Sequence, residues 1–234
     1  PMSEYLPAPV GEQFPLLERD SSWVRVLPSE SHIARIFRAG GPHPTQWFDF
    51  REYGPLDGRF DPHPLPTGES PGIGVMYGVL ASEVAPEVAA PPILADSPFT
   101  AAILEVFQAQ RMIRLNAGMP TFADFATTRP LHLLDLADSD WVTAAGGNAA
   151  ISSGERASSR AWARAIVERY PEIDGVISPS SLLPRARIVT LWSRAASALP
   201  VHPDALIRLD RAELSGVIDA IAERYRYTLV STLL

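Results

Sequence analysis

The stretch GIGVMYGVL, residues 72–80, decides the fold that we predict. Apart from its three glycines and Tyr77 it is wholly apolar, which is typical of a strand buried on both faces. The glycines allow another chain or a ligand to come close to the backbone of the strand. We therefore predict a buried strand here, in contact with other chain segments or a ligand.

Outward from this strand, hydrophobic periodicity and turn residues predict further strands and helices. We expect strands at 32–39, 129–136, 174–178 and 186–192, helices at 82–90, 99–115, 158–170 and 211–225, and a strand or a tail at 226–234. Residues 40–72 are rich in Gly, Pro and Asp and predict a long loop, which its aromatic residues keep packed. The pattern indicates one α+β domain at 31–234, with mixed or antiparallel sheets and flanking helices, after an irregular extension at 1–30.

Composition excludes several kinds of chemistry. The 234 residues carry a net charge of −7, which argues weakly against nucleic acid as a partner. There is no cysteine, and all 20 basic residues are arginine, so thiol nucleophiles, thiolate metal sites and lysine Schiff bases are ruled out. No apolar run reaches the ~20 residues that span a bilayer. The N-terminus lacks the features of a secretory signal, and we expect a cytoplasmic protein.

Known cofactor and metal motifs are also missing. There is no P-loop, no HExxH and no GxSxG sequence. The glycines at 72, 74 and 78 are spaced one residue too widely for a dinucleotide fingerprint. The five histidines are scattered without metal-ligand spacing, so we predict no metal site and no bound cofactor.

The turn-rich stretch GRFDP, residues 58–62, contains an arginine beside a phenylalanine. An arginine in a loop is usually a solvated charge. Phe60, however, predicts a loop pinned to the core, and a pinned guanidinium can be aimed at an anion. Arg59 is therefore a candidate for anion binding, with a solvated or structural arginine as the alternative.

Four stretches in order carry a resemblance to a known family. They are GRFDP around Arg59, VMYGVLAS around Tyr77, VAPEV around Glu87 and DGVISPSS around Ser180. The sequence RPLHLLDL and a Trp-bearing helix lie between the third and the fourth, and HIARIFRAGG with Arg35 precedes the first. Together, over roughly residues 30–195, they resemble the RES domain, a bacterial toxin family.

The resemblance implies a fold similar to that of ADP-ribosyltransferases and an enzyme that degrades NAD. Such an enzyme cleaves the nicotinamide–ribose bond, with phosphate or water as acceptor, and NAD is its substrate rather than a cofactor. It also implies a Xre-like DNA-binding antitoxin as partner, without direct contact of the chain to nucleic acid or membrane. A homodimer is left open.

The chemistry of NAD cleavage suits the residue types in these motifs. The leaving nicotinamide departs neutral, so the reaction needs neither a general acid nor a metal. It needs a carboxylate to stabilise an oxocarbenium-like transition state, and a cationic fork for the pyrophosphate. Arginine, tyrosine, glutamate and a hydroxyl group supply these functions without cysteine, lysine or histidine.

The resemblance assigns a role to each candidate. Arg59 binds the NAD phosphates, with Arg35 as a further substrate-binding residue. Tyr77 stacks on nicotinamide or orients the ribose, Glu87 stabilises the developing cation, and Ser180 helps to place the phosphates or the acceptor. The ordinary alternatives are a core tyrosine, a helix-surface glutamate (with Glu83 as a local competitor) and a turn serine.

The sequence also departs from the family. The family's arginine beside the serine is missing, so Arg185 or Arg187 would have to replace it, which leaves phosphorolysis and hydrolysis both open. Ala85 stands where arginine-modifying ADP-ribosyltransferases carry a second acidic residue. This difference argues against an activity that modifies proteins. An ADP-ribosyltransferase acting on a macromolecule and a non-catalytic binding module remain the alternatives.

Overall fold

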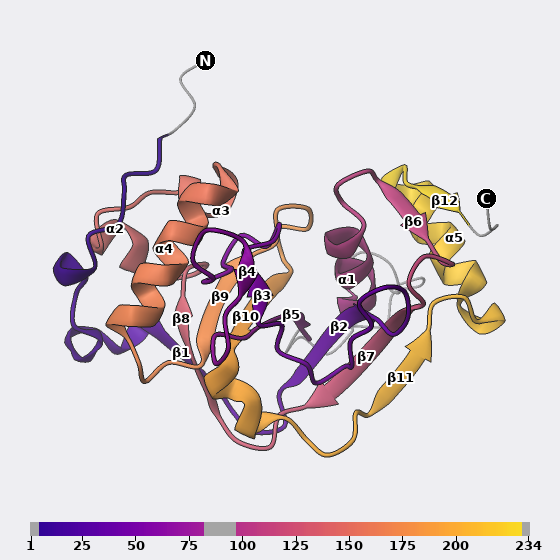
Figure 1. Ribbon diagram of the computed structural model, residues 1–234, viewed down its shortest axis with the longest axis horizontal. Helices are drawn as coiled ribbons and strands as arrows, with labels where there is room; N and C mark the ends of the chain where they lie inside the picture. The colour runs from indigo at the N-terminus through magenta and orange to yellow at the C-terminus, as the bar shows by residue number, and fades with distance from the viewer. Residues whose placement is uncertain (1–4, 82–96, 231–234) are drawn as a thin grey trace.

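The computed structural model describes residues 5–81 and 97–230 of the chain (Figure 1). Its centre is a curved eight-stranded sheet with the order β1-β8-β9-β10-β5-β2-β7-β11. These strands are β1 (Val24–Leu27), β2 (His32–Arg38), β5 (Val75–Leu80), β7 (Pro120–Ala126), β8 (Leu131–Asp135), β9 (Gly175–Pro179), β10 (Arg187–Trp192) and β11 (Ala205–Arg208). β8 and β9 are parallel and the other neighbours are antiparallel, so the sheet is mixed.

Two small sheets and five helices complete the described part of the chain. The small sheets pair β3 (Tyr53–Gly54) with β4 (Gly68–Glu69), and β6 (Met112–Arg114) with β12 (Thr228–Val230). The helices are α1 (Pro98–Val106), α2 (Trp141–Ala144), α3 (Ala150–Ser153), α4 (Arg156–Arg169) and α5 (Ala212–Tyr225). Short 3-10 helices are η1 (Gly11–Gln13), η2 (Leu17–Arg19), η3 (Ser21–Trp23) and η4 (Ser193–Ala198).

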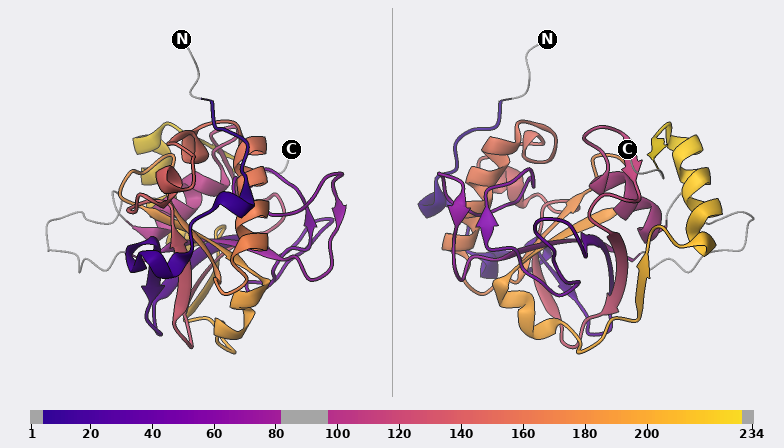
Figure 2. Two further views of the ribbon diagram at one scale, coloured as in Figure 1. Left: turned by 90° about the vertical axis from the view of Figure 1, so that its left-hand side faces the viewer. Right: turned by 45° about the vertical axis from the view of Figure 1, so that its right-hand side comes forward.

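The helices form two groups on the sheet. In both Figure 1 and Figure 2, α2, α3 and α4 lie over one half of the sheet, while α1 and α5 lie toward the other half. A cluster around Trp141, Trp162 and Val176 fills the space under the first group. A second cluster, which includes Ile103 and Ile221, fills the space under the other. These two apolar clusters lie on either side of the middle of the sheet.

The predicted central strand is confirmed as β5, which pairs with β10 along its whole length, from Val75 to Leu80. Its other neighbour, β2, pairs with it only at Ile33 and Ala34. Beyond these two residues, Arg51 takes the place beside Val75. The two strands therefore part in the middle of the sheet, and polar side chains come together there.

The sequence-based expectation of an α+β chain with a mixed sheet and flanking helices is confirmed. Likeness to the ADP-ribosyltransferase fold stays a prediction. The expected helix at 99–115 is wrong in its second half, because α1 ends at Val106. Arg111 adopts a positive φ of 47°, which breaks helical continuity, and Met112–Arg114 instead forms a parallel pair with β12. Periodicity of apolar residues does not reveal such a pairing partner, which lies more than 110 residues away.

Residues 5–30 are more regular than expected. They include β1, which pairs with β8 at the edge of the large sheet. Phe14 is buried and lies against the rings of Trp141 and Trp162. The expected loop at 40–72 is mostly irregular, and Trp47 is buried in it as predicted. The helix predicted at 82–90 lies outside the described residues.

The Asp-Gly pair before β9 has a structural explanation. Asp174 receives two hydrogen bonds from Arg129, at 2.8 and 3.0 Å, and one from the amide of His132 at 2.9 Å. At Gly175 a Cβ atom would lie only 2.1 Å from the carbonyl oxygen of Thr190, so no larger residue fits there. The pair fixes β9 between β8 and β10.

No helix in the described ranges has the length and apolar character needed to cross a membrane.

Candidate functional site

A cavity of about 470 Å³ lies where β2 and β5 part. Its floor includes Tyr77 and Thr190, which are paired across β5 and β10. One wall is formed by α1 and the residues after it, and the other by the ends of α3 and α4. The cavity therefore lies between the two groups of helices, on the face of the sheet that carries the clusters around Trp162 and Ile103.

Arg59 lines this cavity, and the loop that carries it is pinned as predicted. Phe60 is 2% exposed and packs in the cluster with Trp162. Arg59 Nη1 donates to the carbonyl oxygen of Gly154 at 2.7 Å and to Ser159 Oγ at 3.2 Å. Both acceptors are neutral, so the hydrogen bonds fix the guanidinium without cancelling its charge.

The electrostatic surroundings of Arg59 favour an anion. Burial, and then the neighbouring charge of Arg156, lower the pKa of Arg59, while the carboxylate of Glu105 acts in the opposite direction. Two guanidinium groups are thus held close enough to repel each other in a partly desolvated space. An anionic ligand would relieve both the desolvation and the repulsion.

Arg35 also lines the cavity and is held by backbone oxygens. Its Nη1 donates to the carbonyl oxygens of Trp47, at 2.9 Å, and Asp49, at 3.2 Å. Its Nε atom is buried and has no hydrogen-bond partner among the described residues. Burial, opposed by the charge of Asp49, lowers the pKa of Arg35 to about 10. Arg35 therefore stays charged at neutral pH, with an unused donor.

A fourth arginine, Arg51, lines the cavity and is neutralised by a residue of the GRFDP turn. Asp61 is fully buried and accepts from Arg51 Nη2 at 2.7 Å and from the amide of Leu56 at 2.9 Å. His63 also donates to Asp61 through its amide and its ring. Burial acts to raise the pKa of Asp61, but these bonds outweigh burial and keep the pKa below its ordinary value. Asp61 thus stays ionised, and its ion pair with Arg51 fixes the loop that carries Arg59.

Tyr77 reaches the same loop from below. Its ring packs against the cluster around Trp162, and its hydroxyl group is buried without a hydrogen-bond partner in the part of the chain that the structure describes. A Cβ atom at Gly58 would lie 2.0 Å from that hydroxyl group, so Gly58 is the residue that lets the loop cross over Tyr77. Burial raises the pKa of Tyr77 far above its ordinary value, which keeps the phenol neutral.

Sequence analysis missed Glu105, the carboxylate that α1 presents to the cavity. Ser180 donates a short hydrogen bond to Glu105 Oε1. The side chain of Gln108 donates to Glu105 Oε2 at 3.2 Å. The available signal was a single acidic residue within the apolar run AILEVF of this helix, residues 102–107.

The structure places Ser180 behind the cavity wall rather than in it. The residue is 7% exposed, and its oxygen accepts from the amides of Leu182, at 3.1 Å, and Leu183, at 3.0 Å. It therefore combines the turn role, which was the ordinary alternative, with a contact to Glu105. The fold brings three of the predicted residues to one cavity, namely Arg59, Arg35 and Tyr77. Ser180 reaches this site only through its hydrogen bond to Glu105. Glu87, like Glu83, lies outside the described residues.

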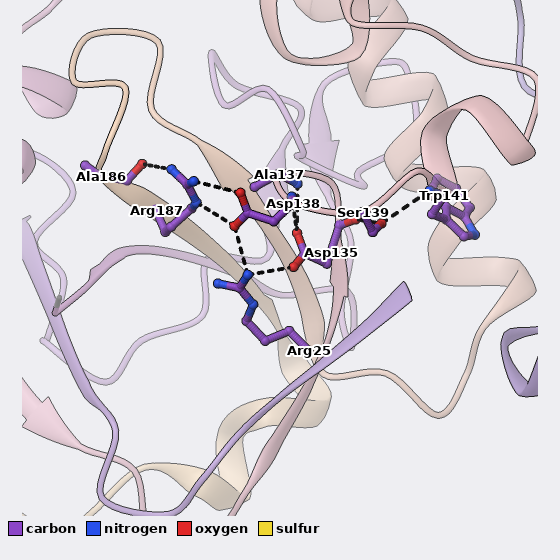
Figure 3. A network of polar contacts seen from close by, with 8 residues as sticks. All are labelled: Arg25, Asp135, Ala137, Asp138, Ser139, Trp141, Ala186 and Arg187. Carbon is purple, nitrogen blue, oxygen red and sulfur yellow. Dashed lines mark hydrogen bonds and ion pairs between the residues drawn. The ribbon is translucent and has the colours of Figure 1, made fainter. Parts of the chain in front are cut away.

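Arg187, considered above as a substitute phosphate ligand, is committed elsewhere. Figure 3 shows its guanidinium against Asp138, with Nε at 3.0 Å and Nη2 at 2.8 Å from the two carboxylate oxygens. Arg25 of β1 joins both Asp138, at 2.8 Å, and Asp135, at 3.0 Å. Arg187 is not among the residues that line the cavity. This network instead fastens β1, β8 and β10 together.

One group in the described ranges has the composition of a metal site. His32, Asp124 and Asp204 have their donor atoms within 4.8 Å of one another. Hydrogen bonds account for their positions, because His32 Nδ1 lies 2.8 Å from Asp124 and Asp204 accepts from the amide of Ala126. The group is not part of the cavity lining.

Comparisons with known proteins give one structural likeness. No protein-family model and no curated protein sequence matches the chain. A chain in the crystal structure of the M. tuberculosis MbcT–MbcA toxin–antitoxin complex is similar to it, with a TM-score of 0.48 and 18% sequence identity. The likeness covers 82% of this chain and 91% of that chain. At this level it carries no argument about what the present chain does.

Proposed function

We propose that the chain is an enzyme that binds NAD in the cavity between α1 and α4 and cleaves its nicotinamide–ribose bond. The observation that carries the proposal is that Arg59 and Glu105 face one partly buried cavity, while the hydrogen bonds of Arg59 within the described ranges go to neutral groups. A dinucleotide has the matching features, an anionic pyrophosphate and a ribose that becomes cationic during cleavage. The four motifs that resemble the RES domain support the same reaction.

Each role follows from the position of a side chain. Arg59 binds a phosphate group, because its guanidinium is fixed by the Gly154 carbonyl and Ser159 and still has unused donors. Arg35 lines the same cavity, and its guanidinium adds a second positive charge for the same ligand. Tyr77, which stays neutral, provides a flat wall for an aromatic ring. These groups bind and orient the substrate without a metal ligand among them.

In this proposal Glu105, which lines the cavity, is the carboxylate that stabilises the oxocarbenium-like transition state. Its carboxylate is oriented by Ser180 on one oxygen and Gln108 on the other. A preorganised carboxylate stabilises developing positive charge without reorganising during the reaction. Glu87 remains a second candidate, on the resemblance alone.

The resemblance also leads us to propose a biological role as a toxin held by an antitoxin. In this proposal a Xre-like DNA-binding protein encoded nearby covers or enters the cavity and prevents NAD from binding. Phosphate and water are both retained as acceptors, because Arg187, one of the two proposed phosphate ligands, is bound to Asp138.

The test is nicotinamide release from NAD by the purified chain, with and without phosphate. Glu105→Gln and Glu87→Gln are compared, since each replaces a carboxylate by a group of the same shape. We expect Glu105→Gln to lower kcat by at least about 100-fold, as is typical for loss of an electrostatic stabiliser. Full activity in Glu105→Gln with loss in Glu87→Gln would move the role to Glu87. No release by folded wild-type protein would refute the reaction, and transfer of labelled NAD to a macromolecule would replace it by ADP-ribosylation.

A further inference from the structure

Arg156 crosses the edge of the cavity and ties together three segments of the chain. Its Nη1 donates to the carbonyl oxygen of Asp57 at 2.9 Å and forms an ion pair with Asp57 Oδ2 at 2.9 Å. Its Nη2 donates to Gln108 Oε1 at 3.2 Å. Asp57 belongs to the Arg59 loop and Gln108 follows α1, so these contacts link both walls of the cavity. All three residues line it.

The ion pair within this link is weakly held. The side chain of Asp57 is 82% exposed and that of Arg156 is 32% exposed. An exposed pair of this kind contributes at most about 1 kcal/mol, because water competes for both partners. Arg156 is also the first residue of the 14-residue helix α4, whose amino end adds positive potential at the same point. A second anion with more charge would therefore displace the carboxylate of Asp57.

From this geometry we propose that Asp57 occupies a phosphate position in the empty cavity, and that the pyrophosphate of the substrate replaces it on Arg156. Arg156 would then hold the substrate together with Arg59, whose charge it already repels. The inference rests on the proposed function, since it assigns a residue to the diphosphate of the same dinucleotide. It makes Arg156 a binding residue and Asp57 a competitor for the same guanidinium.

The proposal predicts that removing the negative charge of Asp57, a cavity residue, improves the binding of a diphosphate. Asp57→Asn removes the competing charge but keeps the shape of the side chain. We expect it to bind ADP, a nucleoside diphosphate, about two- to fivefold more tightly, which corresponds to the strength of an exposed ion pair. Arg156→Gln should weaken ADP binding about tenfold or more, as expected for a lost charge-assisted hydrogen bond.

The experiment measures ADP affinity by calorimetry for wild type, Asp57→Asn, Arg156→Gln and the double variant. Asp210→Asn is the matched control, because it removes the same charge from an ion pair with Arg208 outside the cavity. The gain from Asp57→Asn should vanish in the Arg156→Gln background and be missing in Asp210→Asn. Should Arg156→Gln not fold, Arg156→Met, which removes the charge but keeps an unbranched apolar stem, replaces it in the cycle.

Three results would overturn the proposal: no gain in Asp57→Asn, an equal gain in the control, or a gain that persists without Arg156. Failure of wild-type protein to bind ADP would overturn it as well. NAD cleavage is followed separately. If wild type binds ADP and Asp57→Asn improves binding, but nicotinamide is never released, the role of Arg156 stands and the proposed reaction fails.

Discussion

The hydroxyl group of Ser180 donates to the carboxylate of Glu105, joining the turn after β9 to α1 across 75 residues of sequence. The same hydroxyl oxygen accepts two amides of its own turn, so the serine has no freedom to rotate away. The carboxylate is consequently fixed by a residue that does not itself line the cavity. Ser180 is a positioning residue in this arrangement.

Ser180→Ala should therefore act through Glu105. We expect kcat for NAD cleavage to fall about tenfold with little change in KM, because the carboxylate is displaced while the phosphate site is intact. Loss of the buried hydrogen bonds should also lower the free energy of unfolding by about 1–3 kcal/mol. The decisive comparison is Ser180→Ala in a Glu105→Gln background. A further tenfold fall there would mean that Ser180 acts independently of Glu105.

The sequence predicted local features of the site better than its assembly. The turn residues and Phe60 correctly indicated a pinned Arg59, because a buried aromatic residue beside a loop charge is a local signal. The strand around Tyr77 was equally clear from its apolar run. Pairing between Ser180 and Glu105 could not be foreseen, because it depends on how α1 lies against the turn after β9.

The errors have a common physical origin in long-range pairing. Apolar periodicity continues past Val106, so it predicted one long helix, although Met112–Arg114 gains hydrogen bonds as a strand beside β12. The cavity lies where β2 parts from β5, and Arg51 takes the place beside Val75 there. Neither the pairing of β6 with β12 nor the parting of β2 from β5 can be predicted from the local sequence pattern.

The unpartnered hydroxyl group of Tyr77 leads to a second prediction. Burying a hydroxyl group without a partner costs about 1–3 kcal/mol, so Tyr77→Phe should leave stability unchanged or raise it slightly. NAD cleavage should persist, because the proposed role uses the ring. Thermal unfolding and nicotinamide release measure the two effects. Loss of activity beyond about 100-fold would show instead that the hydroxyl group bonds the substrate. Tyr77→Ala, which removes the ring, should lower stability by about 3–5 kcal/mol.

A third prediction concerns the crossing of the Arg59 loop over Tyr77. Gly58→Ala would place a methyl group against the phenol, so the loop must shift and carry Arg59 with it. We expect a loss of about 1–3 kcal/mol in stability from overpacking, and at least about tenfold weaker ADP binding. Gly216→Ala is the control, since nothing lies within 4 Å of its Cβ position in α5. That variant should be stabilised by about 0.5–1 kcal/mol. Equal behaviour of the two variants would contradict a specific role for Gly58.

The last prediction is a pH dependence of stability at the network of Figure 3. Hydrogen bonds from Arg187, followed by the contacts of Arg25, hold the pKa of Asp138 below its ordinary value despite some burial. A carboxyl group with a lowered pKa in the folded state stabilises the fold above its unfolded pKa, and loses that effect as pH falls through the folded pKa. At pH 7 Asp138→Asn should therefore lower the free energy of unfolding, by at most about 1 kcal/mol since the carboxylate is 39% exposed.

The deficit of Asp138→Asn should shrink as pH falls below about 4, because the wild-type carboxyl group then becomes protonated and also loses its charge. Urea unfolding of both proteins between pH 7 and pH 2.5 measures this convergence. Arg187→Gln should show the same trend, since it removes the partner that contributes most to the shift. A deficit that stays constant over the whole range would mean that Asp138 acts through shape and neutral hydrogen bonds rather than through its charge.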